Sequence, residues 1–289
     1  MTVLEVLNWA TGRFKEHRIE SPRLNAELLL ARTLSVSREG LYVHLQDPLG
    51  EGEKEAVEGL VRRRLSGEPL QYILGHQEFW SIDLRVDPRV LIPRPDTELL
   101  VEQALSILSR IDPGKPLTVL EMGTGSGAIA IALARETGRV LLVATDISTE
   151  AIRLARSNAR EAGVLERLRF VTGDVFGPFH LSEGGEPFDL IISNPPYVVR
   201  SEIERLDREV KDFEPTLALD GGEDGLGFHR KIVSESPGYL RRGGWLLLEV
   251  GQGQADAVSG IVETGGKFDS VDKIRDLSGI ERVVKARRR

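Results

Sequence analysis

The run Asn194-Pro195-Pro196-Tyr197 combines residue types that could activate a planar, amide-like nitrogen. Such a nitrogen is a poor nucleophile because its lone pair is delocalised. The Asn194 side-chain oxygen and the Pro195 carbonyl can accept hydrogen bonds from the NH₂ group and turn its lone pair toward an electrophile. Consecutive prolines hold the loop rigid, and Tyr197 offers a flat face to a planar group. Orientation and fixed dipoles would drive this chemistry, without a general base or a metal.

A glycine-rich run, Gly123-Thr124-Gly125-Ser126-Gly127, follows an apolar stretch and precedes a helical one. Glycines permit a tight turn, and the free amides at a helix start suit an anionic group. That group could be the methionine carboxylate of S-adenosylmethionine. Because Gly123, Gly125 and Ala128 also satisfy the dinucleotide pattern, the loop alone leaves an NAD site open.

Acidic residues follow the next two predicted strands. Asp146 comes 23 residues after Gly123, where a carboxylate can accept both ribose hydroxyls of either cofactor. Asp174 and Val175 stand where an adenine edge would be contacted. The run at residues 194–197 decides between the cofactors, because it follows a buried strand at the ligand-binding edge of the predicted sheet and a dehydrogenase would leave it unexplained.

The elements that must position these loops alternate between strands and helices, which is typical of a parallel sheet with crossover helices. Helices are predicted at residues 128–137 and 148–162, the second capped by Ser148. Strands are predicted at residues 117–122, 140–145, 168–172, 188–193 and 245–250. Residues 267–272 and 281–285 predict an antiparallel hairpin at the edge of this sheet.

Residues 1–75 predict a small helical domain without a catalytic constellation. Ser21-Pro22 is typical of a helix start, with Ser21 as the cap. Two of its helices would bury apolar residues at helical spacing, namely Leu4, Leu7 and Ala10, then Leu24, Leu28 and Ala31. The basic run at residues 62–64 is interpreted as a solvated helix face, and the run at residues 287–289 as a solvated tail.

Residues 76–98 predict a connector with β-hairpin character between this domain and a catalytic domain at residues 99–289. Residues 79–86 alternate like a strand, and two prolines keep residues 91–96 extended. Asp96 or Thr97 is then expected to cap a helix that ends near residue 110.

Composition narrows the function classes. The 289 residues carry a net charge of −7, whereas a protein that mainly binds nucleic acid usually presents a basic face. No cysteine is present, so a thiolate nucleophile or a Cys-ligated metal is excluded. The N-terminus lacks the pattern of a signal peptide, and no apolar run approaches the roughly 20 residues of a membrane span. We therefore expect a cytoplasmic protein that contacts neither membranes nor nucleic acids.

The order of the glycine loop, Asp146, Asp174 and residues 194–197 resembles the class I amino methyltransferases. Three further stretches resemble the release-factor glutamine N5-methyltransferases of the HemK/PrmC type, namely residues 91–98 (LIPRPDTE), 215–226 (PTLALDGGEDGL) and 248–251 (LEVG). The resemblance covers essentially the whole chain. It implies an α/β fold: a Rossmann-like methyltransferase domain with a mostly parallel seven-stranded sheet and an antiparallel C-terminal edge, after a small helical domain.

The resemblance also implies a reaction, methyl transfer from S-adenosylmethionine to the glutamine side-chain nitrogen of the Gly-Gly-Gln motif in peptide chain release factors. By position, residues 123–127, Asp146, Val175 and Asn194 would hold the cofactor, and residues 194–197 the glutamine. The helical domain would read the release factor, and the protein would be a monomer. In this chain Glu121-Met122 stands where Asp-Leu is common, and Val175 stands where some relatives place a larger residue.

Three other functions account for only part of the sequence pattern. A nucleic-acid amino methyltransferase would use the same loop, since exocyclic amines are also planar, but the acidic balance and the connector stretch disfavour it. A NAD-dependent dehydrogenase is suggested by the glycine loop alone. An inactive binding module is the least favoured alternative, because the glycine loop, the acidic residues and the run at residues 194–197 are all intact.

Overall fold

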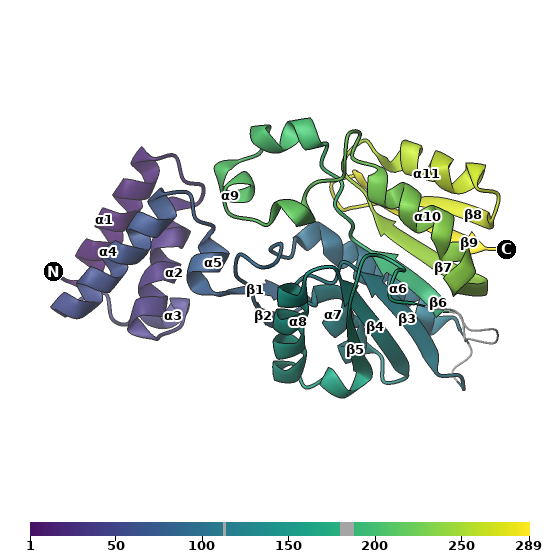
Figure 1. Cartoon of the computed structure of the whole chain (residues 1–289). Coiled ribbons are helices and arrows are strands. Elements are labelled where there is room, and N and C mark those ends of the chain that lie inside the picture. Colours follow the sequence, from purple (N-terminus) through teal and green to yellow (C-terminus); the bar gives the residue numbers. More distant parts are fainter. Residues whose placement is uncertain (112–113, 180–187) are drawn as a thin grey trace. The chain divides into compact units, whose positions relative to one another are not determined.

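The computed structural model in Figure 1 describes residues 1–111, 114–179 and 188–289. The chain folds as two units. Unit 1 consists of Met1–His76 and Asp207–Phe213, and unit 2 consists of Gln77–Leu206 and Glu214–Arg289. A short segment far along the sequence thus belongs to the first unit, although no sequence pattern indicated this return.

Unit 1 is helical, which confirms the predicted small helical region. It contains α1 (Val3–Glu16), α2 (Pro22–Leu34), α3 (Arg38–Leu41), α4 (Glu51–Leu65), α5 (Leu70–Leu74) and, from the returning segment, α9 (Arg208–Lys211). Helix α1 begins with a capping box, in which Thr2 and Glu5 each accept a hydrogen bond from the other's amide. Its buried face includes Leu7 and Ala10, as expected, together with Phe14.

Helix α2 departs from the sequence expectation in two details. Ser21 occupies the N-cap position, but its φ of +46° is left-handed and its side chain makes no capping hydrogen bond. The buried stripe is also shifted, because Leu29 and Leu30 are buried whereas Leu24 and Leu28 stay half-buried. Helices α1 and α4 contact α2 and bury that stripe.

The interpretation of residues 62–64 as a solvated face is wrong for Arg64. This side chain is buried, donates to Asn25 Oδ1 at 2.8 Å and pairs with Glu209 Oε1 at 2.5 Å. A buried guanidinium needs such partners, and Glu209 comes from the returning segment. The interpretation of residues 287–289 as a tail is also wrong, since Arg287 lies in the last strand and places its guanidinium over the Trp245 ring.

Unit 2 contains the predicted seven-stranded sheet. Its strand order is β5 (Leu168–Thr172), β4 (Val140–Asp146), β3 (Leu117–Met122), β6 (Phe188–Ser193), β7 (Leu240–Glu249), β9 (Glu281–Arg288) and β8 (Phe268–Arg275). The first five strands pair in parallel, and β9 runs antiparallel to both of its neighbours. The predicted antiparallel edge is therefore confirmed.

Helices cover both faces of this sheet (Figure 1). Helices α6 (Glu98–Ser109), α7 (Ala128–Glu136) and α8 (Thr149–Glu161) contribute to the apolar core on one face. Helices α10 (Gly227–Tyr239) and α11 (Ala255–Thr264) contribute to the core on the other. Every residue of β6 is buried, which explains why its sequence reads as a continuous apolar run.

Residues 76–85 form a hairpin, which agrees with the hairpin character expected of the connector, although its turn interrupts the strand-like alternation at residues 79–86. Strands β1 (His76–Phe79) and β2 (Ile82–Arg85) pair across Trp80 and Ser81. Both turn residues have a φ of +53°, the left-handed conformation that a two-residue hairpin turn requires. The sequence hides this turn because neither residue is glycine or asparagine.

Candidate functional site

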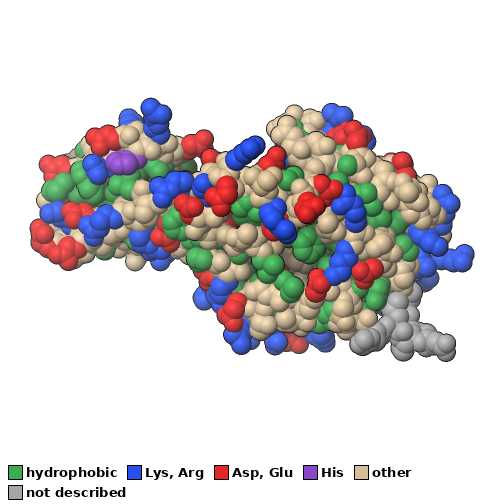
Figure 2. All heavy atoms as spheres, turned by 45° about the horizontal axis from the view of Figure 1, so that its top comes forward, with side chains coloured by type: hydrophobic (Ala, Val, Ile, Leu, Met, Phe, Trp, Pro, Cys, Tyr) green, Lys and Arg blue, Asp and Glu red, His purple; other side chains and the backbone are tan. Residues whose placement is uncertain are grey.

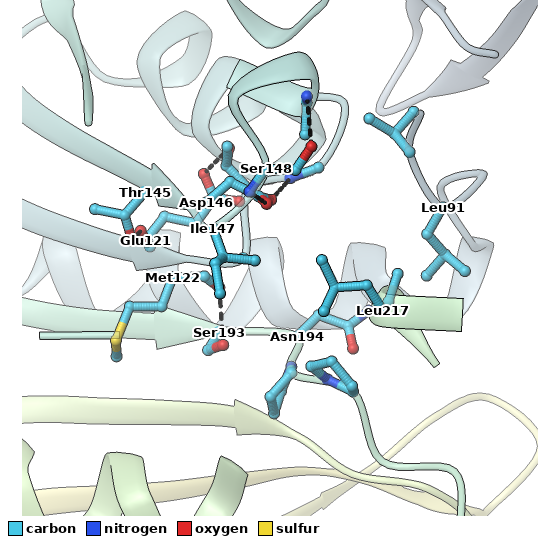
Figure 3. A pocket seen from close by; sticks show the side chains of 18 of the residues that line it. Leu91, Glu121, Met122, Thr145, Asp146, Ile147, Ser148, Ser193, Asn194 and Leu217 are labelled. Atoms are coloured by element: carbon cyan, nitrogen blue, oxygen red, sulfur yellow. Dashed lines mark hydrogen bonds between the residues drawn. The ribbon is translucent and has the colours of Figure 1, made fainter. Parts of the chain in front are cut away.

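A cavity opens at the carboxyl ends of three adjacent strands, β3, β4 and β6, within unit 2. In an open parallel sheet this edge is where ligands bind. Figure 3 shows Glu121 and Asp146 on one side of the cavity, with Leu91 and Leu217 across from them. All the site residues predicted from sequence line the cavity except Gly127 and Tyr197.

The glycines of the first loop have different surroundings. Gly123, Gly125 and Gly127 have φ values of +72°, +55° and +87°, which side chains rarely adopt. A Cβ at Gly125 would meet nothing within 4 Å, so bare backbone faces open space. A Cβ at Gly127 would lie 3.0 Å from Ile131 Cδ1 and 3.2 Å from the Ala155 Cβ. Gly127 therefore lets helices α7 and α8 approach each other.

Asp146, the last residue of β4, ties two loops together. Its Oδ2 accepts the Gly125 amide and its Oδ1 accepts the Ser148 amide, both at 2.9 Å. Burial raises the pKa of this carboxyl, while the two amides act in the opposite direction. Each oxygen keeps a second lone pair for a ligand hydroxyl. Ser148 caps α8 as predicted, since it accepts from the Ala151 amide.

Glu121 is a buried carboxyl in the cavity wall that was not expected to have a role in the site. Its Oε2 accepts a hydrogen bond from the Thr124 hydroxyl at 2.7 Å. Burial raises the pKa of Glu121 to about 8, so a cationic ligand group would favour its ionised form. An acidic residue inside an apolar strand, two positions before the first glycine, is the signal that could have revealed it.

The far end of the cavity is apolar with an acidic rim. Val175 has a φ of +49°, a strained conformation for a β-branched residue. Asp174 beside it is half-exposed and pairs with Lys231 at 2.6 Å. Phe228 and Ile232 of α10 also line the cavity, so the aromatic cover that Val175 lacks comes from another helix. No local pattern connects these helix residues with a cofactor.

The loop at residues 194–197, called the Asn194 loop below, leaves the end of β6. Asn194 Nδ2 donates to Thr97 Oγ1 at 3.2 Å, which leaves Oδ1 as the side-chain acceptor. Thr97 stands at the N-cap position of α6 without capping it, and Asp96 pairs with Arg282. The expected capping role of these residues is therefore wrong, because both are engaged elsewhere.

Tyr197 lies at the back of the Asn194 loop. A Cβ on Gly251 would lie only 3.1 Å from Tyr197 Cδ2, so the ring packs closely against that glycine. Gln254 Nε2 donates to the Tyr197 carbonyl, and Gln254 Oε1 accepts from the Gly251 amide, both at 2.9 Å. Burial raises the pKa of Tyr197 to about 12, and the nearby Glu249 adds to this.

The stretch at residues 215–226 supports the Asn194 loop through its backbone. The Val198 amide donates to the Leu219 carbonyl at 2.9 Å, and the Gly221 amide donates to the Val198 carbonyl at 2.8 Å. A Cβ on Gly225 would lie 2.5 Å from the Tyr197 carbonyl oxygen. This stretch is therefore the scaffold of the loop, and its exposed Leu217 lines the cavity mouth.

Two family models match the chain. Residues 5–75 match the PrmC N-terminal domain, and residues 97–210 match the methyltransferase small domain. A release factor glutamine methyltransferase of Geobacter sulfurreducens is 46% identical over 99% of this chain and 96% of its own length. One of Moorella thermoacetica is 39% identical over 100% of this chain and 99% of its own length.

The chain belongs to the release factor glutamine methyltransferase family. Relatives that match over their full length show this membership, and the strand order of the sheet is consistent with a methyltransferase domain. The catalytic domain of hMettl16, solved with the MAT2A 3'UTR hairpin 6, superposes with a TM-score of 0.55 over 82% of this chain and 81% of its own. Its sequence identity is 12%, so this likeness concerns the fold alone.

Within residues 1–111, 114–179 and 188–289, no group of three or more His, Cys, Asp or Glu side chains is placed to hold a metal ion. None of the helices in these ranges has the length and apolarity that crossing a membrane would require.

Proposed function

We propose that this chain transfers a methyl group from S-adenosylmethionine to the side-chain nitrogen (N5) of the glutamine in the Gly-Gly-Gln motif of peptide chain release factors. One observation supports this most directly. The Asn194 loop lines the same cavity as the glycine loop and Asp146, in a chain whose relatives carry the name of that activity over their full length.

The residues of the cavity fit the parts of this cofactor. When bound, S-adenosylmethionine supplies a methyl group on a sulfonium. The bare backbone at Gly125 and the start of α7 suit its carboxylate, and Glu121 suits its ammonium. Asp146 has acceptors left for the ribose hydroxyls. Asp174 would accept from the adenine amine, with Val175 as apolar cover.

The glutamine amide would be oriented by two acceptors of the Asn194 loop. Asn194 Oδ1 and the Pro195 carbonyl would each accept a hydrogen bond from its NH₂ group. These bonds favour a nitrogen turned out of conjugation, with its lone pair aimed at the methyl carbon. Directly after transfer the nitrogen carries the methyl group, both of its protons and a positive charge. Such an N-protonated amide is a strong acid and loses one proton to water, so a dedicated base is not required. Pro196 and Tyr197 would hold the loop and the neighbouring peptide.

Unit 1 would bind the release factor. Its helices offer no catalytic constellation, and the chemistry described above needs residues of unit 2 alone. Deletion of residues 1–75 should leave cofactor binding largely intact and should lower turnover on a complete release factor much further. We also propose that the enzyme is a monomer, which light scattering would check.

The second candidate is methylation of a nucleic-acid amine. The solved structure with an RNA hairpin shares the fold and nothing more. Acidic and basic side chains are intermixed over the face shown in Figure 2, without a continuous basic surface. This arrangement favours a protein substrate.

The test is methyl transfer to a purified release factor that carries unmodified glutamine. We expect a mass increase of one methyl group on the glutamine of the Gly-Gly-Gln motif. A glutamate in its place should not be methylated, because a carboxylate would face the two acceptors with lone pairs. An asparagine should react poorly, because its nitrogen falls short by about one bond length. Methylation of DNA or RNA, with none on the release factor, would overturn the proposed substrate. It would leave the proposed methyl-transfer chemistry standing.

A further inference from the structure

Leu217 is an exposed leucine at the mouth of the cavity. Its side chain lines the cavity, and the residue is 53% exposed. Single exposed leucines are common on protein surfaces and by themselves indicate nothing. The place of this one matters, because Figure 3 shows it across the cavity from Asp146, on the side where Asn194 lies.

The turn that carries Leu217 has a well-fixed backbone. It is the 3₁₀ turn η4 (Thr216–Ala218). Its last amide donates to the Pro215 carbonyl at 2.8 Å, and its first carbonyl accepts from the Asp220 amide at 2.9 Å. A side chain on such a turn is held in place before a ligand arrives, so binding costs little backbone entropy.

The buried carboxyl of Glu214 joins the start of this turn to the connector. Glu214 is 5% exposed, its Oε2 accepts from the Ile92 amide at 3.1 Å, and its Oε1 pairs with the Arg94 guanidinium. Pro93 and Pro215, which are next to these residues in the chain, also line the cavity. Two distant stretches thus form one apolar rim beside the Asn194 loop.

A glutamine side chain has two apolar methylene groups between its backbone and its amide. When the amide reaches Asn194 Oδ1 and the Pro195 carbonyl, these methylene groups must leave water at the cavity mouth. An aliphatic side chain on the rim can cover them, and the removal of apolar surface from water favours binding. Leu217 meets this need. Ile147 is also exposed and lines the cavity, but it follows Asp146 on the cofactor side.

We propose that Leu217 is a substrate-binding residue that covers the methylene groups of the reactive glutamine at the cavity mouth. The inference rests on the proposed function and deepens it, because it adds an apolar contact to the two hydrogen bonds of the Asn194 loop. It assigns Leu217 to recognition of the release factor and gives it no part in holding the cofactor.

The test compares three variants in methyl transfer to an unmodified release factor at saturating S-adenosylmethionine. Leu217→Ala removes the aliphatic contact, Leu217→Asn replaces it with a polar group of similar size, and Leu217→Met keeps an apolar side chain of similar volume. We expect the KM for the release factor to rise about tenfold in the Ala and Asn variants, with kcat within about threefold of wild type. The Met variant should stay within about threefold in both constants.

Two further measurements separate substrate binding from other roles of this leucine. Calorimetric titration of Leu217→Ala with S-adenosylmethionine should give an affinity within about twofold of wild type, and its Tm should stay within about 2 °C, since the side chain is largely exposed. Leu277→Ala is the matched control, because Leu277 is also exposed and is not among the residues that line the cavity. Leu217→Asn gives the same readout if Leu217→Ala does not fold.

An unchanged KM in Leu217→Ala would overturn the assignment and leave the proposed function intact. An equal rise in KM for the Ala and Met variants would also overturn it, because the apolar contact would then not be the cause. A loss of cofactor affinity as large as the rise in KM would mean that Leu217 covers the cofactor instead. A wild-type enzyme that methylates no release factor would overturn the proposed function, and this assignment with it.

Discussion

The two sides of the cavity are held in place in different ways. On the cofactor side, the Thr124 amide donates to the Thr145 carbonyl and the Gly125 amide donates to Asp146, each at 2.9 Å. These bonds join the ends of two neighbouring strands. On the substrate side, the Asn194 loop is held by side chains and backbone from three distant stretches, through Thr97, Leu219 and Gln254.

This difference teaches where substitutions should act. The cofactor side is largely a product of the sheet, so its side chains should affect affinity for S-adenosylmethionine. The substrate side depends on an assembly of loops, so its side chains and its supports should affect the rate of methyl transfer. Variants on both sides and measurements at different pH test this division.

The largest effect is expected for Asn194→Ala. Loss of the acceptor that orients the nitrogen should lower the single-turnover rate by about 10²–10³-fold. Cofactor affinity should change far less, and calorimetric titration serves as the control. A rate within about threefold of wild type at saturating cofactor would show that the loop is only structural.

Asp146→Ala should give the opposite pattern. Two ribose hydroxyls lose a charged acceptor, and hydrogen bonds to charged groups contribute about 1.5–3 kcal/mol each at most, so affinity should fall by about 10–100-fold. Titration of S-adenosylmethionine measures this loss. Asp174→Ala is the comparison, since that carboxyl is half-exposed and already paired with Lys231, and its effect should be smaller. Unchanged affinity in Asp146→Ala would refute the ribose assignment.

Gly225→Ala should damage the substrate side without touching the cavity. The new Cβ would lie 2.5 Å from the Tyr197 carbonyl oxygen and 2.7 Å from Gln254 Nε2, at a residue with a φ of +75°. We expect a stability loss of about 1–3 kcal/mol and a transfer rate lower by about tenfold. Thermal unfolding and single-turnover kinetics measure the two effects.

Gly238→Ala is the matched control for that variant. It lies in α10, where a Cβ would meet nothing within 4 Å, so stability should stay equal or rise slightly. Equal behaviour of the two alanine variants would mean that the Gly225 contact does not support the loop.

The smallest effect concerns pH. Burial raises the pKa of Glu249 to about 7. If the ionised carboxylate supports the Asn194 loop, which it approaches at Tyr197, the transfer rate should decline severalfold as the pH falls through about 7. Glu249→Gln should flatten this part of the profile, and a profile identical to wild type would exclude Glu249 as its source.

Stability should follow pH in the opposite sense. The pKa of Glu249 is higher in the folded chain than its ordinary value of 4.5, so its contribution is fully present below about 4.5 and is lost as the pH rises through about 7. Thermal unfolding of wild type and Glu249→Gln should therefore diverge progressively between about pH 4.5 and 7 and stay apart above 7, with the Gln variant more stable.

The sheet could be predicted from sequence because its central strands β3, β4 and β6 are largely apolar and each ends at a recognisable loop. The same reason made the cavity predictable, since Gly123, Asp146 and Asn194 directly follow β3, β4 and β6. Adjacent parallel strands end at one edge, so residues separated along the chain meet there.

What the sequence could not reveal depends on contacts between distant stretches. Tyr197 packs at the back of its loop because it contacts Gly251 and Gln254, which follow β7 more than 50 residues later in the chain. Thr97 reads as a helix cap, and only the arrival of Asn194 gives its hydroxyl another partner. Phe228 becomes part of the cavity through the placement of α10, which no local pattern determines.

The return of residues 207–213 to unit 1 has a consequence for the order of folding. Arg64 precedes its carboxylate partner Glu209 by 145 residues, and a ribosome makes the N-terminal part first. The Arg64 guanidinium in unit 1 therefore lacks its carboxylate partner until β6 and the Asn194 loop have been synthesised. Completion of the first unit is a late event in the biogenesis of the chain, and it follows the synthesis of the loop that performs the chemistry.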